Sequence, residues 1–218
     1  MKMGKEILKL LTVVALVMGT LGSCKKEAGL KYSCDENIHQ FVSQHLDSWE
    51  GITLERINMY GIDTQRAIFN AISDENKAEL WRAKMEYIKA TETLSPDMET
   101  HLDILRDMIT PDIYSDSMLA DAVVLYVNDH VKSLIANDTL ITYYLYTLFT
   151  YEPFGEFMNN FYEQSTPLDA KKNCHCTTES IFDCPLVSFH KCNSGADCDP
   201  TSWGCGFGWV WPCNGRCE

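Results

Sequence analysis

The sequence predicts a mainly α-helical protein that ends in a small, disulfide-rich module of loops and short β-strands. Apolar residues recur at helical spacing between residues 35 and 163, and the alternation typical of strands is nowhere sustained. Eight of the ten cysteines then lie in the last 46 residues, where prolines and glycines replace the helical pattern. We therefore expect five or six helices, followed by a cysteine-rich tail.

Helix start signals divide the helical region into segments. Ser73 precedes two acidic residues, and Ser95 and Thr110 each precede a proline, which suits the first turn of a helix because no N–H donor is needed there. The predicted helices cover residues 35–48, 63–72, 74–93, 96–109, 115–136 and 138–150. The last segment has β-branched and aromatic residues that favour a strand, but its length and the cap at Asn137 favour a helix.

The predicted organisation has four parts: a signal peptide (1–24), a helical domain (25–164), a linker (165–172) and a disulfide-rich module (173–218). The linker contains Ser, Thr and Pro residues and ends in Lys171 and Lys172. Because exposed polar linkers are common sites of proteolysis, these two lysines form a candidate processing site. Alternatively, they only keep the linker solvated.

The N-terminus is typical of an export signal. Three lysines precede an apolar run from Leu10 to Leu21, which is too short to cross about 30 Å of hydrocarbon as a helix. The end of this run, Leu21-Gly22-Ser23-Cys24, resembles the lipobox of bacterial lipoproteins, which implies lipidation of Cys24. Acyl chains, palmitate among them, would then hold the protein on a membrane of the cell that produces it. We therefore expect a cell-envelope lipoprotein, at the outer membrane or the periplasmic face. The alternative is an ordinary cleaved signal with a chance cysteine, and either reading exports the chain to a compartment where disulfides persist.

Charge and motif content exclude several function classes. The net charge is -13, and residues 25–172 contain 13 basic and 25 acidic residues, so we expect no nucleic acid as partner. The acidic surface is interpreted as solvated helix faces. His39, His45, His101 and His130 are isolated, and no HExxH, GxSxG or Gly-rich phosphate loop is present. We therefore expect no enzyme, no catalytic residues and no cofactor.

The cysteine-rich tail is expected to depend on disulfides. A segment this small buries too little apolar area to offset its ordering entropy, and four disulfides at roughly 2–4 kcal/mol each would compensate. Spacing leaves the pairing open, although Cys174 and Cys176 are too close to pair with each other without strain. Zinc is a weaker alternative, because no CxxC pair is present. The predicted half-cystines are Cys174, Cys176, Cys184, Cys192, Cys198, Cys205, Cys213 and Cys217.

Cys34 is then left without a partner, because the lipobox uses Cys24 and the tail cysteines pair among themselves. It is either a buried thiol or a cross-link between two copies of the chain in a dimer.

Three tryptophans and a phenylalanine lie among glycines near the C-terminus: Trp203, Phe207, Trp209 and Trp211. Such rings suit a membrane–water boundary or a hydrophobic receptor groove, so we predict that they form an exposed ridge that contacts a target. The alternative is that they form the core of the module itself. The tail has two basic and five acidic residues, which disfavours a cationic pore former.

The order of these residues resembles the fulvocin C family of cysteine-rich bacteriocins. The resemblance depends on Asn173-Cys174-His175-Cys176, on Asp183-Cys184-Pro185, on Gly204-Cys205-Gly206-Phe207-Gly208-Trp209-Val210 and on Cys213-Asn214-Gly215. The resemblance covers the last 46 residues. The layout of the whole chain, an exported helical region followed by this module, is similar to that of fulvocin C-related lipoproteins. The resemblance implies an antibacterial peptide with four disulfides, released near Lys172. The spacing of Cys213 and Cys217 departs from the family pattern, so the last disulfide can differ.

These observations favour a bacteriocin precursor that is exported, attached to a membrane and directed at the envelope or membrane surface of competing bacteria. A second hypothesis is a surface lipoprotein that is never released and binds a glycan, a peptide or a protein. A third is an inhibitor or immunity-type lipoprotein.

Overall fold

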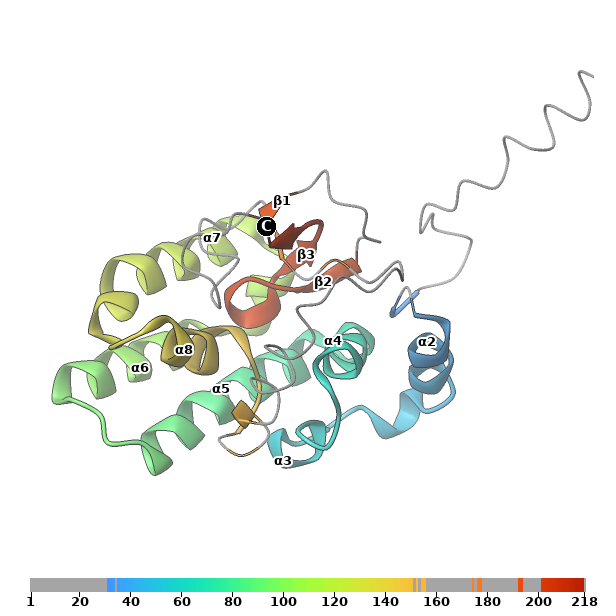
Figure 1. Ribbon diagram of the computed structural model, residues 1–218, viewed down its shortest axis with the longest axis horizontal. Coiled ribbons are helices and arrows are strands. Elements are labelled where there is room, and N and C mark those ends of the chain that lie inside the picture. Colours follow the sequence, from blue (N-terminus) through green and yellow to red (C-terminus); the bar gives the residue numbers. More distant parts are fainter. Residues whose placement is uncertain are drawn as a thin grey trace, which may run out of the picture. The chain divides into compact units, whose positions relative to one another are not determined.

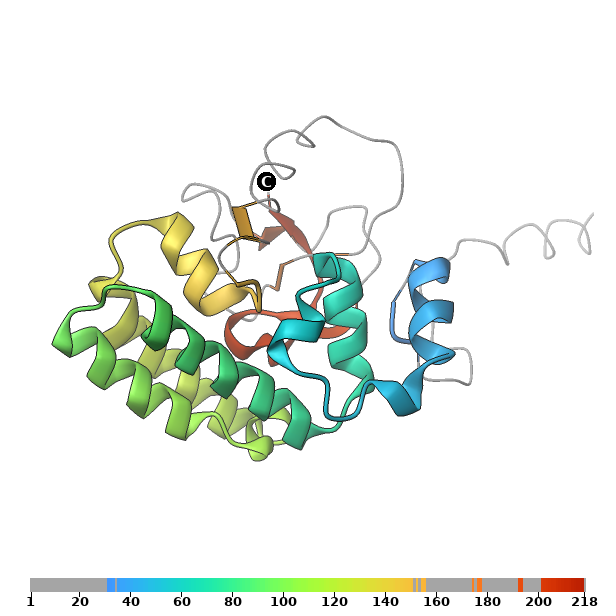
Figure 2. The ribbon, with the colours of Figure 1, turned by 90° about the horizontal axis from the view of Figure 1, so that it is seen from below.

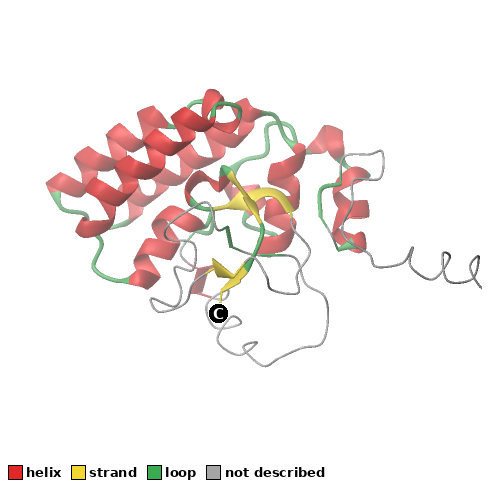
Figure 3. Ribbon diagram, turned by 90° about the horizontal axis from the view of Figure 1, so that it is seen from above, coloured by secondary structure: helices red, strands yellow, loops and turns green. Residues whose placement is uncertain are grey.

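The computed structural model describes residues 31–33, 35–150, 152, 154–155, 174, 176–177, 192–193 and 201–217, with the backbone alone for 201–203, 216 and 217. Residues Lys31–Glu218 form one compact unit. Most of the described part is helical, with short strands near the C-terminus (Figures 1 and 3). The predicted fold class is therefore confirmed.

The helical region is a succession of α-helices and shorter 3-10 and π turns. In chain order these are α2 (Glu36–Ser43), η1 (Leu46–Ser48), α3 (Leu54–Ile57), α4 (Ile62–Ala71), α5 (Asp74–Thr91), α6 (Pro96–Met108), η2 (Pro111–Tyr114), α7 (Ser117–Tyr126), η3 (Val127–Val131), η4 (Lys132–Leu134), α8 (Asp138–Ile141) and η5 (Thr142–Tyr146). Helix α6 packs against both α5 and α7 (Figure 2).

Side-chain caps define where the central helices begin. The Ser73 hydroxyl accepts a hydrogen bond from the backbone N–H of Asn76 at the start of α5. The Ser95 hydroxyl accepts one from the N–H of Met98 at the start of α6. These bonds satisfy N–H groups that have no partner within the helix. The predicted helices 74–93 and 96–109 are confirmed to within two residues at each end.

Other segments differ from the prediction in detail. Residues 35–48 form α2 and then η1, and α3 was not predicted because four residues are too few to show helical periodicity. The predicted helix 115–136 begins at Ser117 and passes at Val127 into the π turn η3 and the 3-10 turn η4. The predicted helix 138–150 is helical only as far as Tyr146. The spacing of apolar residues does not distinguish an α-helix from a local π or 3-10 turn.

The helices and the C-terminal segment share one hydrophobic core. Ile68, Trp81 and Leu102 of the helices are fully buried, and the same cluster contains Trp209 and Val210. The predicted domain limits, at residues 164 and 173, lie outside the described residues. Within the described part, the aromatic residues of the tail join the interior of the helical region, while Cys174, Cys205 and Cys213 form a small separate buried cluster.

Two antiparallel strand pairs give the C-terminal segment its backbone framework. Strand β2 (Thr201–Cys205) pairs with β3 (Trp211–Cys213), and the turn η6 (Phe207–Trp209) lies between them. Strand β1 (Cys192–Asn193) pairs with β4 (Arg216–Cys217). Figure 3 shows these strands in yellow next to the helices. The short strands agree with the prediction of a tail with loops and little regular structure.

A glycine is required where the chain leaves β2. Gly206 has a φ of 72°, a left-handed conformation that residues with a Cβ rarely adopt. A Cβ atom at this position would lie 2.4 Å from Cδ1 of Trp211. Backbone conformation and packing therefore both exclude a larger residue here.

The helical core also contains a buried lysine. Lys84 is 0% exposed, donates a hydrogen bond from Nζ to the carbonyl oxygen of Phe149, and has Nζ 3.8 Å from the ring centroid of Tyr143. Burial lowers the pKa of Lys84 well below its ordinary value of 10.5, and the negative charge of Glu92 opposes this shift only partly.

We predict that Gly206→Ala lowers the free energy of unfolding by about 2–4 kcal/mol, since backbone strain and overpacking both contribute. Gly51 is the matched control, because its φ is 70° and a Cβ there would meet nothing within 4 Å. Gly51→Ala is expected to cost only the backbone strain, about 1–2 kcal/mol. Chemical denaturation of both variants measures the difference. Equal losses would contradict the close approach to Trp211.

We also predict that the protein becomes more stable as the pH rises from neutrality toward pH 10. The unfolded chain keeps the Lys84 proton up to about 10.5, whereas the folded chain loses it at lower pH, so the free energy of unfolding rises by up to about 1.4 kcal/mol per pH unit between the two values. Above pH 10 the trend reverses, because burial raises the pKa values of Tyr114 and Tyr143. Urea denaturation of the wild type and Lys84→Met across this range tests the assignment. A rise of the same size in the variant would refute it.

Candidate functional site

The candidate site is the aromatic loop, residues 206–211, which contains the connection between β2 and β3 and the first residue of β3. The Cys205–Cys213 disulfide, with its Cα atoms 5.2 Å apart, closes the base of this loop. Gly208 and Trp209 follow Gly206 with positive φ values of 65° and 55°. A bulky residue in this conformation costs about 1–2 kcal/mol, so other contacts of Trp209 must offset that strain.

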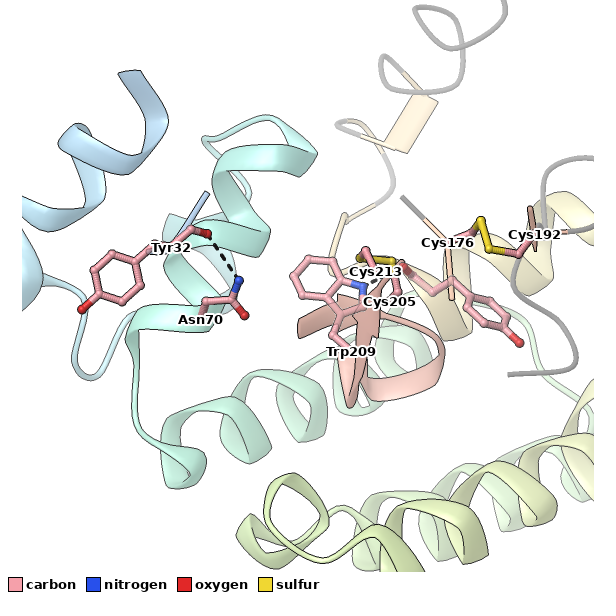
Figure 4. Close-up of a disulfide and its surroundings, with 8 residues drawn as sticks. Tyr32, Asn70, Cys176, Cys192, Cys205, Trp209 and Cys213 are labelled. Carbon is pink, nitrogen blue, oxygen red and sulfur yellow. Dashed lines mark hydrogen bonds between the residues drawn. A yellow bond between two sulfur atoms is a disulfide. The ribbon is translucent and has the colours of Figure 1, made fainter. Parts of the chain in front are cut away.

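The indole of Trp209 is completely buried among the helices. Its ring meets those of Phe69 on α4 and Trp81 on α5 edge to face, with centroid distances of 5.2 Å and 5.9 Å. Its Nε1 donates a hydrogen bond of 3.0 Å to the carbonyl oxygen of Tyr146 at the end of η5. Aromatic pairs of this geometry contribute about 0.5–1.5 kcal/mol each beyond their burial. Figure 4 shows the indole beside the Cys205–Cys213 disulfide.

The neighbouring residues of the loop also contact the helical region. The ring of Phe207 lies 5.6 Å from that of Trp81. The Tyr114 hydroxyl donates a hydrogen bond of 3.3 Å to the carbonyl oxygen of Gly208. Burial, together with the negative charge of Asp74, raises the pKa of Tyr114 well above 10.0. Tyr114 therefore keeps its proton and remains a donor over the whole physiological pH range.

Arg66 on α4 also lies against this part of the tail. Its guanidinium carbon lies 5.9 Å from the centroid of the Trp209 ring, a cation–π arrangement. Its side-chain carbons pass so close to Gly204 that a Cβ there would lie 3.0 Å from Cγ of Arg66. Gly204 also has a φ of 114°. The glycine therefore permits the arginine to lie along β2.

Two of the four rings in the exposed aromatic ridge expected from the sequence are buried in the described structure. Phe207 is 2% exposed and Trp209 is 0% exposed, while Trp211 is half-buried. The side chain of Trp203 lies outside the described residues. The rings are instead part of a core shared with the helices, because their apolar faces meet Phe69 and Trp81. That these residues contact a target stays a prediction, and it requires the loop to leave the helices.

Five of the eight predicted half-cystines are described as disulfide-bonded. Cys176 is bonded to Cys192, with Cα atoms 5.8 Å apart, and Cys205 to Cys213 (Figure 4). Cys174 is also disulfide-bonded. Because Cys176 pairs with Cys192, Cys174 and Cys176 have different partners, as predicted. Cys184, Cys198 and the side chain of Cys217 lie outside the described residues.

Several other predicted positions also lie outside the described residues: Cys24, Cys34, Lys171 and Lys172. Residues 31–33, which precede Cys34, contact α4: the Asn70 amide donates a hydrogen bond of 3.4 Å to the carbonyl oxygen of Tyr32 (Figure 4). Among the described helices, none has the length and apolar character that crossing a membrane requires. The described residues also contain no cluster of three or more His, Cys, Asp or Glu side chains suited to a metal ion.

The residues that receive the aromatic loop were not identified from the sequence. Phe69, Trp81 and Tyr114 belong to helical apolar patterns, which look the same whether the partner is another helix or a distant loop. Arg66 carried no signal beyond that of an ordinary polar helix residue. Only the contact with the tail distinguishes these four residues from the rest of the helical region.

Comparison with known proteins connects a segment of this chain to a family. A segment of 45 residues is 48% identical to bacteriocin fulvocin-C of Myxococcus fulvus, and the match covers 20% of this chain and 93% of that protein. No family model matches the chain, and no solved structure matches it. Because almost the whole of that relative is covered at this identity, the chain belongs, through the matched segment, to the fulvocin-C family.

Proposed function

We propose that the chain is the precursor of a bacteriocin-like antibacterial peptide. The observation that carries this proposal is the 48% identity over 93% of bacteriocin fulvocin-C. The disulfides of Cys176 and Cys205 support it, because small exported peptides depend on such bonds for a defined shape. On this proposal residues 173–218 form the active peptide, held by four disulfides.

Export and attachment precede any release. The apolar run that ends at Cys24 supports secretion and lipidation, which would place the precursor in the cell envelope of its producer. Cleavage in the linker, at or near Lys171 and Lys172, would then cut the covalent connection between the peptide and the lipid-attached helices. Without cleavage, a lipid-attached chain would remain on the cell that made it.

The peptide would act without catalysis, by contact with the envelope or membrane surface of a competing cell. The residues proposed for this contact are Trp203, Phe207, Trp209 and Trp211, since aromatic rings suit an interface between apolar and polar surroundings. In the intact chain Phe207 and Trp209 are buried. The precursor would therefore be inactive until the aromatic loop separates from the helices.

A second candidate function is a surface lipoprotein whose tail is never released. The shared core favours it, because Trp209 and Val210 lie in the same hydrophobic core as the buried residues of the helices. Such a protein would bind a glycan, a peptide or a protein through its surface, with the half-buried Trp211 as one contact residue. Nucleic acid remains an unsuitable partner for a chain with a net charge of -13.

Mass spectrometry of the culture medium distinguishes the two functions. Processing predicts a fragment of about 46 residues that begins near Asn173 and is lighter than the reduced sequence by eight hydrogen atoms, one pair per disulfide. An intact chain found only in the membrane fraction would favour the surface lipoprotein.

The fragment collected from the medium is predicted to inhibit the growth of related bacteria. Trp211→Ala is expected to raise the inhibitory concentration at least about tenfold, since aromatic residues dominate such contacts. Asn193→Ala, a change at an exposed position of β1, is the control and should leave inhibition unchanged. Inactivity of the oxidised wild-type fragment against a broad panel of strains would exclude the bacteriocin function.

A further inference from the structure

The aromatic loop packs against residues from four elements of the helical region, and we call this set of residues the groove. Helices α4 and α5 contribute Phe69 and Trp81, the turn η2 contributes Tyr114, and η5 contributes the carbonyl oxygen of Tyr146. All four contacts converge on residues 208 and 209. Four separate elements of the helical region therefore hold this two-residue segment, three of them through the indole and one through the carbonyl oxygen of Gly208.

The contact combines apolar burial with directional hydrogen bonds. The indole N–H of Trp209 and the carbonyl oxygen of Gly208 each have a partner in the helical region. Both bonds are buried, so they would be exchanged for bonds to water if the loop left. Removal of the loop would also expose the faces of Phe69 and Trp81 that it covers. The separated state is therefore unfavourable for the loop and for the groove.

Long-range charge attraction does not hold the two regions together. Residues 25–172 carry 25 acidic and 13 basic residues, and residues 173–218 carry five acidic and two basic residues. The cation–π contact of Arg66 with Trp209 is local and lies against the ring. Binding that depends on buried rings and buried hydrogen bonds is only weakly affected by salt.

From these observations we propose that the helical region is an inhibitor of the module, one that stays bound to the aromatic loop after the linker has been cut. This inference rests on the proposed function and adds a regulatory step to it. Cleavage alone does not free Phe207 and Trp209, because the groove retains them. The groove and a target compete for the same rings, so activity requires dissociation of the cut precursor as well as cleavage.

The test uses the full chain with a specific protease site placed within residues 165–172. After cutting, the two pieces are expected to elute together in gel filtration, equally at 0.1 and 1 M salt, while a non-reducing denaturing gel shows them as separate chains. Separate elution of the wild-type pieces would overturn the inference. A denaturing gel that shows the pieces still linked would also overturn it, since retention would then be due to a disulfide.

Matched arginine variants test whether the groove is responsible for retention. Arg66→Ala is expected to weaken retention of the cut module about tenfold, through the lost contact with Trp209 and β2. Arg56→Ala is the control, because Arg56 lies over Trp49 at 5.5 Å, and none of its described contacts is with the module. Circular dichroism checks that both variants fold. Equal retention in the two folded variants would refute the role of the groove.

Growth inhibition separates this inference from the proposed function. If both hold, the cut wild-type protein inhibits less than an equal amount of the free fragment, and cut Arg66→Ala lies between them. Full inhibition by the cut wild-type protein would overturn the inference and leave the bacteriocin function intact. Joint elution of the pieces together with an inactive free fragment would support the inhibitor-like contact and contradict the bacteriocin function.

Discussion

Burial of the Trp209 indole is the contact on which the arrangement of this protein depends. It joins a cysteine-rich segment to helices that are far away along the chain, and it places a strained residue, with a φ of 55°, in the interior. Complete removal of a tryptophan side chain from water stabilises a fold by several kcal/mol. That is enough to offset the backbone strain at Trp209, which costs about 1–3 kcal/mol. The helices therefore help to define the conformation of the tail.

The disulfides and the helices have different roles in the tail. The Cys205–Cys213 bond connects residues eight positions apart and the Cys176–Cys192 bond residues sixteen positions apart, so each reduces the number of conformations open to the unfolded chain. Neither bond determines which way the rings point. The direction is set by Phe69, Trp81 and the carbonyl oxygen of Tyr146, which accept the indole in one orientation. The sequence led us to expect a tail shaped by disulfides alone. Its conformation also depends on contacts with the helices.

The segment that resembles bacteriocin fulvocin-C is attached to helices that share its core. The matched segment covers 93% of bacteriocin fulvocin-C but only 20% of this chain. Most of the described residues before the tail form helices, and these bury Phe207 and Trp209. A precursor with this architecture would expose its aromatic residues only after a change in the contact between the two regions. A surface protein with the same architecture would keep those rings as permanent core.

The amino-acid sequence by itself determined the helical class of the chain, the starts of α5 and α6, the cysteine-rich tail and its resemblance to a family. These properties depend on neighbouring residues, such as the caps at Ser73 and Ser95, or on the order of cysteines and glycines. Only the tertiary structure decided where the aromatic loop lies. The partners of Trp209 and Gly208 are 63 and 94 residues away in the chain, and a cluster of rings among glycines is equally compatible with an exposed ridge or with an interior. That choice depends on the shape of a groove assembled from distant helices, which local residue patterns do not encode.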